Sequence, residues 1–287
     1  MDPLQIFIIS MLIALGIGLI ASLFGIGGGF LLYPTMIFVG GMMVHDTVGT
    51  IPFVVVFMAL SSTLAYARQK RIDYTIAVIL IGVSAIGAVI GANTALLIPG
   101  QTLVILFGIT EIVLAGVMAF LRTPQEKKLL NLENDSLTKP KKSKWYVLHR
   151  HKIDANNIEY KYEANILISL PFSFLAGFLS SLLGIGGGAV YIPIYVFLCG
   201  MSIHMAIACS IFSIFLSNIS SAITYAILGK INYFVGFALI IGMVVGAQFG
   251  AYIAKKIKSK RLKRLAAIMM VIIGVWMILF AIIGKPT

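Results

Sequence analysis

Backbone amides carry the most distinctive chemistry in this sequence. The stretch Gly25-Ile26-Gly27-Gly28-Gly29 returns unchanged as Gly184-Ile185-Gly186-Gly187-Gly188, and both copies lie in otherwise apolar sequence. Consecutive glycines favour a break in a helix, and a break exposes backbone N–H groups that no side chain shields. Such groups, and the N-terminus of a helix that starts behind them, bind anions. The predicted site therefore consists of the amides of Gly27, Gly28, Gly29, Gly186, Gly187 and Gly188.

Side chains on the apolar segment after each break add further candidates. In the second copy, hydroxyls recur at spacings of three and four, which places them on one face of a helix: Ser210, Ser213, Ser217, Ser220 or Ser221, and Thr224. The first copy mostly lacks them, with Ile51 in the place of Ser210. Thr50 and Cys209 occupy matched positions near the helix start. We predict substrate contact for Thr50, Cys209, Ser210 and Ser213, with hydrogen bonds inside or between helices as the alternative.

Three further groups could bind and release a proton, which makes a proton a candidate partner. His45 and His204 stand at matched positions after Gly-Met turns that we predict near the outer surface, where capping or contact with water is the favoured interpretation. Glu111 lies in the middle of an apolar segment and is matched by Met270. A carboxylate there should face a cavity or a partner, or be protonated.

Composition indicates a polytopic membrane protein with the lipid bilayer as its solvent. Hydrophobic residues make up 60% and charged residues 11% of the chain, and the mean hydropathy is +1.02. The first apolar run, at 4–24, lacks a basic flank and a cleavage site, so we expect a retained span and no signal peptide. In a membrane protein the distribution of the net charge of +12 matters more than its sum, and no nucleic-acid partner is expected.

The chain contains an internal repeat. The offset between the two glycine motifs is 184 − 25 = 159, and without a gap it also aligns Pro34 with Pro193 and Tyr66 with Tyr225. We predict an N-terminal membrane repeat at 1–121, a basic insert at 122–161 and a C-terminal membrane repeat at 162–287. In both repeats two small-residue motifs, Gly87-x-x-x-Gly91 and Gly246-x-x-x-Gly250, are expected to pack helices.

The predicted fold is all-α, with about eight to ten membrane segments. The expected segments are 4–24, 30–39, 46–67, 74–97 and 101–121, followed by 164–183, 189–199, 205–228, 233–254 and 265–283. Ten to twelve helical residues rise only about 15–18 Å, so the pieces after the glycines cannot cross alone and each repeat holds a discontinuous helix. Pro34 and Pro193 further weaken these short pieces.

The positions of the basic residues favour inverted repeats. With the copies inverted and both termini outside, only Lys230 and Lys285 lie outside, and 22 − 2 = 20 Lys and Arg lie in the cytoplasm. A parallel arrangement would place the seven cations of 255–264 outside, against the positive-inside rule. We therefore expect a multi-pass cell-membrane protein with a cytoplasmic insert.

The insert holds ten basic and five acidic residues and is predicted to be a solvated linker, with contact to anionic lipid as an alternative. Its alternating residues 152–162 favour a small hairpin around Asn156-Asn157.

The doubled motif resembles a known family. A Gly-x-Gly-Gly-Gly stretch with a proline five residues after its last glycine, once in each half of a small helical membrane protein, is similar to the sulfite exporter TauE/SafE family, also called the toluene sulfonate uptake permeases. The resemblance covers nearly the whole chain except the insert. It implies a secondary transporter, by expectation an exporter, for a small sulfur-containing anion such as sulfite, thiosulfate or a sulfonate. A passive anion channel and an intramembrane enzyme or assembly protein are the alternatives.

Other chemistry is not supported by the motifs. The glycine stretch at 184–189 lacks a preceding strand and a later acid, as a dinucleotide site requires, and no phosphate-binding Gly-Lys-Ser/Thr follows either copy. The four histidines and two cysteines have no metal-ligand spacing, and Ser210 has no visible base. We predict no catalytic residue, no metal and no cofactor.

Overall fold

The computed structural model describes residues 3–38, 40–120, 147–155, 157–257 and 259–283. The first half contains α1 (Pro3–Phe24), α2 (Gly29–Phe38), α3 (Val44–Arg68), α4 (Tyr74–Ala95) and α5 (Gly100–Phe120). The second half contains α7 (Ile166–Leu183), α8 (Gly188–Pro193), the π-helix η1 (Ile194–Leu198), α9 (Ile203–Ile227), α10 (Tyr233–Ala254) and α11 (Ser259–Ile283). A hairpin of β1 (Val147–Ile153) and β2 (Glu159–Asn165) precedes α7. Both membrane repeats are therefore helical, as predicted.

Most helices of the two halves begin at positions related by the same offset of 159 residues, and some also end at such positions. Moving the bounds of α3 by 159 residues gives 203–227, the bounds of α9, and moving those of α4 gives 233–254, the bounds of α10. The starts of α2 and α5 move in the same way onto the starts of α8 and α11. The aligned residues thus build one structural unit twice.

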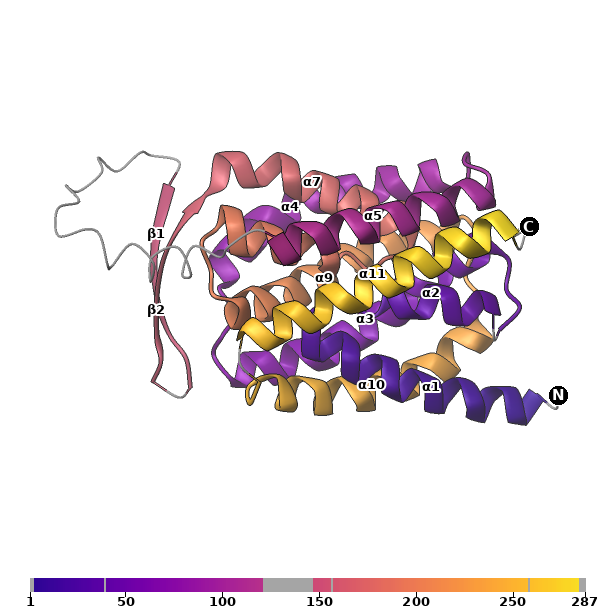
Figure 1. Cartoon of the computed structure of the whole chain (residues 1–287), viewed down its shortest axis with the longest axis horizontal. Helices are drawn as coiled ribbons and strands as arrows, with labels where there is room; N and C mark the ends of the chain where they lie inside the picture. The colour runs from indigo at the N-terminus through magenta and orange to yellow at the C-terminus, as the bar shows by residue number, and fades with distance from the viewer. Residues whose placement is uncertain (1–2, 39, 121–146, 156, 258, 284–287) are drawn as a thin grey trace.

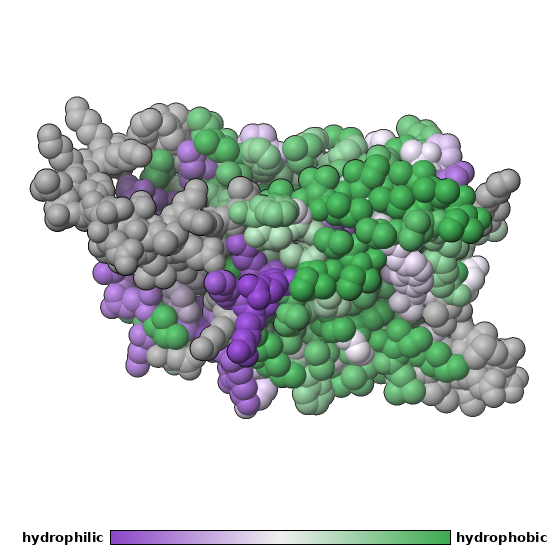
Figure 2. Space-filling model, in the orientation of Figure 1, coloured by the Kyte–Doolittle hydropathy of each residue, from purple (hydrophilic) through white to green (hydrophobic). Residues whose placement is uncertain are grey.

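The exterior of the bundle is apolar. Among the described residues, seven helices are long and apolar enough to cross a membrane: α3, α4, α5, α7, α9, α10 and most of α11. Three shorter apolar stretches, at Ile9–Phe24, Gly29–Phe38 and Gly188–Leu198, bring the segments to 7 + 3 = 10, within the predicted range. Large apolar side chains such as Ile86 and Phe249 are exposed, and hydrophobic surface covers the helical bundle in Figure 2. Such a surface suits lipid.

Each half packs against the other through its small-residue motifs. α7 packs along α4, and α1 packs along α10. A Cβ atom placed on Gly87 would lie 2.3 Å from the carbonyl oxygen of Phe174, and one placed on Gly246 would lie 2.0 Å from that of Leu15. The predicted packing role of these motifs is confirmed, because only glycine permits this approach of the backbones.

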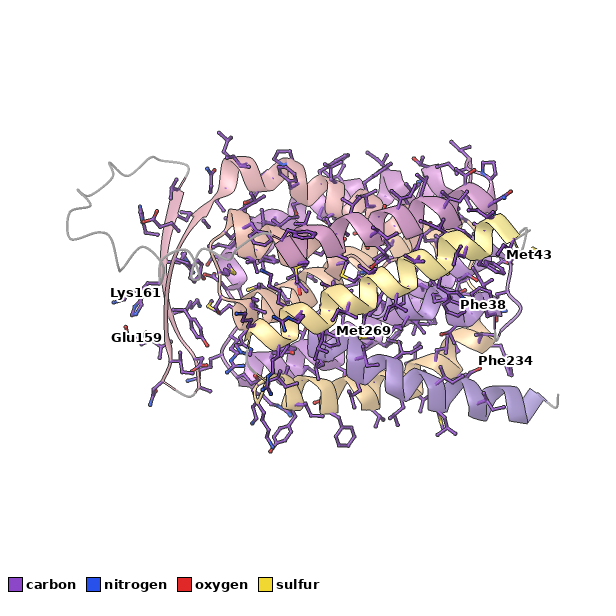
Figure 3. All side chains as sticks on the ribbon, in the orientation of Figure 1. Phe38, Met43, Glu159, Lys161, Phe234 and Met269 are labelled. Carbon is purple, nitrogen blue, oxygen red and sulfur yellow. The ribbon has the colours of Figure 1, made fainter. Side chains whose placement is uncertain are left out.

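Each broken helix pair enters the bundle from one end and returns to that end. α1 begins at the end of the molecule where α11 finishes, and Phe38 and Met43, which follow along the chain, lie at that same end (Figures 1 and 3). α7 begins at the opposite end, beside the hairpin. The chain returns there after η1, since a Cβ on Gly200 would lie 3.2 Å from the Glu163 carbonyl of β2.

The two prolines affect their helices differently. α2 continues as an α-helix through Pro34, whereas the second copy changes to the π-helix η1 directly after Pro193. There the N–H of Cys199 donates to the carbonyl of Ile194 at 3.1 Å, an i to i−5 bond. The prediction that proline interrupts the short pieces is therefore wrong for the first copy and correct for the second. A widened turn of this kind is common at functional sites.

The predicted hairpin is confirmed and is longer than 152–162. β1 pairs antiparallel with β2 from Val147 opposite Asn165 to Ile153 opposite Glu159. β2 therefore extends past residue 162, where we expected the second membrane repeat to begin, and α7 follows it directly at Ile166.

Candidate functional site

Both glycine breaks have a left-handed backbone. The dihedral φ is +91° at Gly27 and +75° at Gly28 in the first break, and +81° at Gly186 and +84° at Gly187 in the second. L-residues rarely adopt this conformation, so the motif requires glycine for its backbone path.

The structure brings the two breaks together in the interior of the bundle. A Cβ on Gly29 would lie 2.4 Å from the Gly184 carbonyl oxygen, and one on Gly188 would lie 2.3 Å from that of Gly25. A Cβ on Gly27 would lie 2.9 Å from the Gly186 carbonyl oxygen. The backbones of the two breaks are therefore in direct contact. The contacts are reciprocal: each of these contacts of the first break with the second has a counterpart in which the matched residues of the two halves change places.

Most N–H groups at these breaks have no acceptor in the part of the chain that the structure describes; those of Gly25 and Ile26, which donate to the Ala21 carbonyl, are the exceptions. The first turn of α2 closes on Gly28, whose carbonyl accepts from Leu32 at 2.9 Å, and α8 closes in the same way on Gly187. The donors left over are the N–H groups of residues 27–30 in the first break and 184–189 in the second. A buried donor without a partner costs about 1–3 kcal/mol, and a cluster of them offers an anion the hydrogen bonds it loses on leaving water.

Ser210 and Ser213 lie beside the broken helices. The Ser210 Oγ is 2.9 Å from the carbonyl oxygen of Gly25, within the first break, and 2.9 Å from that of Ile207. The Ser213 Oγ bonds the Tyr195 hydroxyl of η1 at 2.6 Å. Of the side chains that the sequence suggested, Ser210 is thus in contact with a glycine break.

The side chains of Thr50 in α3 and Cys209 in α9 instead contact the starts of two helices of the opposite half. The Thr50 hydroxyl accepts from the N–H of Asn232 at 2.9 Å, and the Cys209 thiol accepts from the N–H of Asp73 at 3.2 Å. Asn232 and Asp73 are the N-caps of α10 and α4. The matched pair therefore performs one structural task twice, and among the described residues no hydrogen bond joins either side chain to a break.

A buried polar cluster beside the second break escaped the sequence analysis. We call it the Asn218 cluster; its members are Ser84, Ser180, Tyr191, Ser217 and Asn218, all buried. The Asn218 amide donates to the Gly186 carbonyl at 3.2 Å, and a Cβ on Gly187 would lie 2.9 Å from the Ser180 Oγ. Ser84 bonds both Tyr191 and Ser217. A comparison of the two copies could have identified this cluster, because the matched residues of the other copy are apolar. In the order of the cluster they are Met243, Ala21, Leu32, Met58 and Ala59.

The three candidate titrating groups lie apart from one another. The His45 Nε2 donates to the Ile98 carbonyl at 3.0 Å, near the start of α3. His204 follows Gly200 at the hairpin end, so only one of the two histidines lies at the end opposite the hairpin. Glu111 is fully buried, neither of its oxygens has a hydrogen-bond partner among the described residues, and it faces α11 at Gly274.

Two ion pairs join the hairpin to the bundle: Arg71 with Asp154 is buried, and Arg150 with Asp73 is partly exposed on the arginine side. Arg150 of β1 donates to both carboxylate oxygens of Asp73, at 2.9 and 3.0 Å, and the Tyr162 hydroxyl donates to the same carboxylate. Arg71 donates to Asp154 of the hairpin turn at 3.2 Å. Burial opposes ionisation of Asp73, but the hydrogen bonds from Arg150 and Tyr162 outweigh it and lower the pKa of this carboxyl.

At the opposite end of the bundle, the ion pair between Lys230 and Asp46 is longer and more exposed than the two that join the hairpin to the bundle. Lys230 and Asp46 are 3.8 Å apart, and both side chains are more than one-third exposed. A shallow cavity of about 340 Å³ lies beside them, lined also by residues 229 and 231–233. The two ends therefore differ, with a buried clamp at one and a solvated ion pair at the other.

Comparison with known proteins agrees with the fold. The sequence model of the family described as sulfite exporter TauE/SafE matches residues 10–277. The probable membrane transporter protein YunE of Bacillus subtilis is 30% identical over 276 residues, which cover 93% of this chain and 96% of that protein. A probable membrane transporter protein of Methanocaldococcus jannaschii is 29% identical over 295 residues, covering 96% and 97% of the two chains. No solved structure matches.

Proposed function

Since the chain belongs to the sulfite exporter TauE/SafE family of membrane transporters, we propose that it is a secondary transporter that moves a small sulfur-containing anion, such as sulfite, thiosulfate or a sulfonate, across the cell membrane. Export is the direction that the family description favours. One observation carries the assignment of the site: two glycine breaks cross in the bundle interior with buried N–H groups that have no acceptor among the described residues.

The anion is held at this crossing by backbone amides. A singly or doubly charged oxyanion loses many kcal/mol of hydration on entering an apolar interior, so its site must supply donors that are already oriented. The amides of Gly27, Gly28 and Gly29 and those of Gly186, Gly187 and Gly188 are such donors, and the starts of α2 and α8 add partial positive charge. No buried Arg or Lys is needed at the crossing.

Access alternates between the two sides because the repeats are inverted in the membrane. The broken pairs enter from opposite ends of the bundle. The packing is also symmetric, because α1 of the first half packs on α10 of the second as α7 of the second half packs on α4 of the first. Rocking of one half against the other would then open the crossing first to one end and then to the other.

The hairpin end faces the cytoplasm, and the start of α1 and the end of α11 face outward. The exposed lysines and arginines around the start of α11 gather at the hairpin end, where Figure 2 shows hydrophilic surface. Lys230 is the basic residue described at the other end. This distribution follows the positive-inside rule.

Flux through proteoliposomes tests the function. Liposomes that contain the purified protein should release sulfite in a saturable manner, and a short sulfonate should slow this release. Single-channel currents would instead establish the passive anion channel. A protein that moves no sulfur oxyanion in either direction would refute the proposal.

Glycine variants test the site. Gly28→Ala and Gly187→Ala place a side chain on a left-handed backbone, at a cost of about 1–2 kcal/mol each, and crowd the amides, so we expect flux to fall at least about tenfold with the fold retained. Gly82→Ala is the matched control, because a Cβ there meets nothing within 4 Å. Equal flux in all three variants would show that the glycine breaks do not form the anion site.

A further inference from the structure

The two breaks differ in the chemistry that surrounds them, although their backbones are alike. At the first break, a Cβ on Gly28 would lie 2.6 Å from the Met243 methyl carbon and 3.0 Å from the Ala21 methyl. At the second break, the matched glycine contacts Ser180, the counterpart of Ala21. Ser84 is the counterpart of Met243, and it bonds Tyr191, whose ring lies 3.0 Å from a Cβ on Gly187. Around Gly28 the crossing is therefore apolar, although Ser210 bonds the Gly25 carbonyl of the same break, whereas Gly187 is lined by the Asn218 cluster.

The orientation of the Asn218 amide is fixed by its surroundings. Its nitrogen has two hydrogens, and both have acceptors, the Gly186 carbonyl at 3.2 Å and the Ile214 carbonyl at 2.8 Å. The reverse orientation would turn the amide oxygen toward two carbonyl oxygens, which repel it. The oxygen Oδ1 is therefore the free atom.

This oxygen is a buried acceptor without a donor. Asn218 is fully buried, and no described residue donates to its Oδ1. The Ser180 Oγ, beside Gly187 on the same break, is likewise buried and has no partner among the described residues. In the first half, alanine occupies both positions, at 59 and 21. Two unsatisfied polar atoms are thus confined to one break, where each would cost about 1–3 kcal/mol unless a ligand meets it.

The ligand that satisfies this set must have two kinds of polar atom. Anionic oxygens accept from the glycine amides, but they cannot satisfy Oδ1, which accepts and cannot donate. We infer that the transported anion has a hydrogen-bond donor of its own, an O–H or N–H group next to the charged oxygens, and that Asn218 Oδ1 accepts from it. Hydrogen sulfite and sulfonates with a hydroxyl or amino group belong to this class; sulfate and plain alkyl sulfonates do not. The inference rests on the proposed anion site.

A matched pair of sulfonates tests the inference. 2-Hydroxyethanesulfonate and propane-1-sulfonate have equal numbers of heavy atoms and the same charged group, and only the first has a donor. In calorimetric titrations of the full chain in detergent, we expect the hydroxyl compound to bind at least about tenfold more tightly, because a site built to bond a hydroxyl disfavours the analogue that lacks it.

Two variants assign the preference to its residue. Asn218→Ala and Ser180→Ala introduce the residues of the first half. Asn218→Ala should bring the affinity ratio of the two compounds close to one by weakening only the hydroxyl compound. Asn93→Ala is the control, since Asn93 is an exposed helical asparagine bonded to its own turn, and it should keep the ratio.

The outcomes separate this inference from the proposed function. Equal affinity for the two compounds in the native chain, or a preference that persists in Asn218→Ala, overturns the inference and leaves the anion site in place. The native chain supplies this result even where the Asn218 variant fails to fold. If neither sulfonate nor sulfite binds the native chain, the proposed function fails and the inference fails with it.

Discussion

Single glycines in this chain serve two different purposes, and the distinction has measurable consequences. At the breaks, glycine permits a left-handed backbone, whereas in the regular helices it permits close packing of two backbones. Gly177 belongs to the second group, because a Cβ there would lie 2.0 Å from the carbonyl oxygen of Ser84. The same substitution should therefore affect stability at one kind of site and transport at the other.

Gly177→Ala should lower the melting temperature of the purified protein in detergent. Overpacking of a tight contact typically costs about 1–3 kcal/mol, and here the obstructing atom belongs to the backbone and cannot rotate away. Gly116→Ala, with nothing within 4 Å of the added carbon, should leave the melting temperature unchanged. An unchanged melting temperature for Gly177→Ala would show that α4 and α7 are less closely packed.

Glu111 is a residue whose replacement should stabilise the protein. Both carboxylate oxygens are buried and have no hydrogen-bond partner among the described residues, and an unsatisfied buried polar group costs about 1–3 kcal/mol. Glu111→Met introduces the residue that occupies the matched position in the second half, Met270. We expect a higher melting temperature for this variant. A lower one would mean that a bound partner holds Glu111, and would support a role in proton coupling.

At the scale of helices and strands, the repeat made most of the fold predictable. The predicted segment 74–97 corresponds to α4 (Tyr74–Ala95), and 233–254 has the bounds of α10. Apolar periodicity and turn residues mark such boundaries in any membrane helix. The π-helix η1 was not predictable, because the same proline leaves α2 intact and only the surroundings differ.

The candidate site was predictable in its backbone and much less so in its side chains. The glycine motifs identify the breaks because few other functions need three consecutive glycines inside apolar sequence. Thr50 and Cys209 were chosen for their chemistry, but their partners, the caps of α10 and α4, come from the other half of the chain. Asn218 was not predictable from the spacing of the hydroxyls, because it has none, and only its difference from Ala59 in the first half marks it.

The hairpin should come loose from the bundle in acid. The pKa of Asp73 is lowered in the folded protein by its hydrogen bonds with Arg150 and Tyr162. A lowered pKa contributes stability that is complete above the unfolded value, about 3.9, and is lost as the pH falls through the folded value. At neutral pH we therefore expect the hairpin to resist trypsin. After brief incubation below pH about 4, an antibody directed against the hairpin should bind more of the protein than it does in a sample kept at neutral pH.

A variant of Asp73 and a control on the same strand as Arg150 provide the comparison for this prediction. Asp73→Asn should expose the hairpin to trypsin already at neutral pH and remove the dependence on acid. His149→Ala is the control on the same strand, because the ion pair of His149 with Glu163 is more than half exposed and contributes little. Acid dependence that persists in Asp73→Asn would assign the effect to another carboxylate, such as Asp154.

At the scale of the whole molecule, the two ends of the bundle differ in charge, and the orientation that we propose follows from this difference. The hairpin, with Glu159 and Lys161 on it, lies at one end of the bundle, and Met43 and Phe234 lie at the other (Figure 3). A basic end with a buried clamp and an opposite end with a solvated ion pair fit a transporter whose two sides meet different solutions.

Inversion of the repeats can be tested with a single pair of matched residues. Lys70 and Gly229 are related by the offset of 159, both are exposed, and both have a left-handed backbone, with φ of +54° and +65°. Because Lys70 already places a side chain on this backbone, a cysteine is expected to be tolerated at either position. The native Cys199 and Cys209 are buried and should contribute little background. In intact cells, a membrane-impermeant maleimide should label Gly229→Cys, and it should label Lys70→Cys only after the membrane is permeabilised. Labelling of both positions from one side would require parallel repeats and would refute the inversion, because matched positions of inverted repeats must face opposite sides of the membrane.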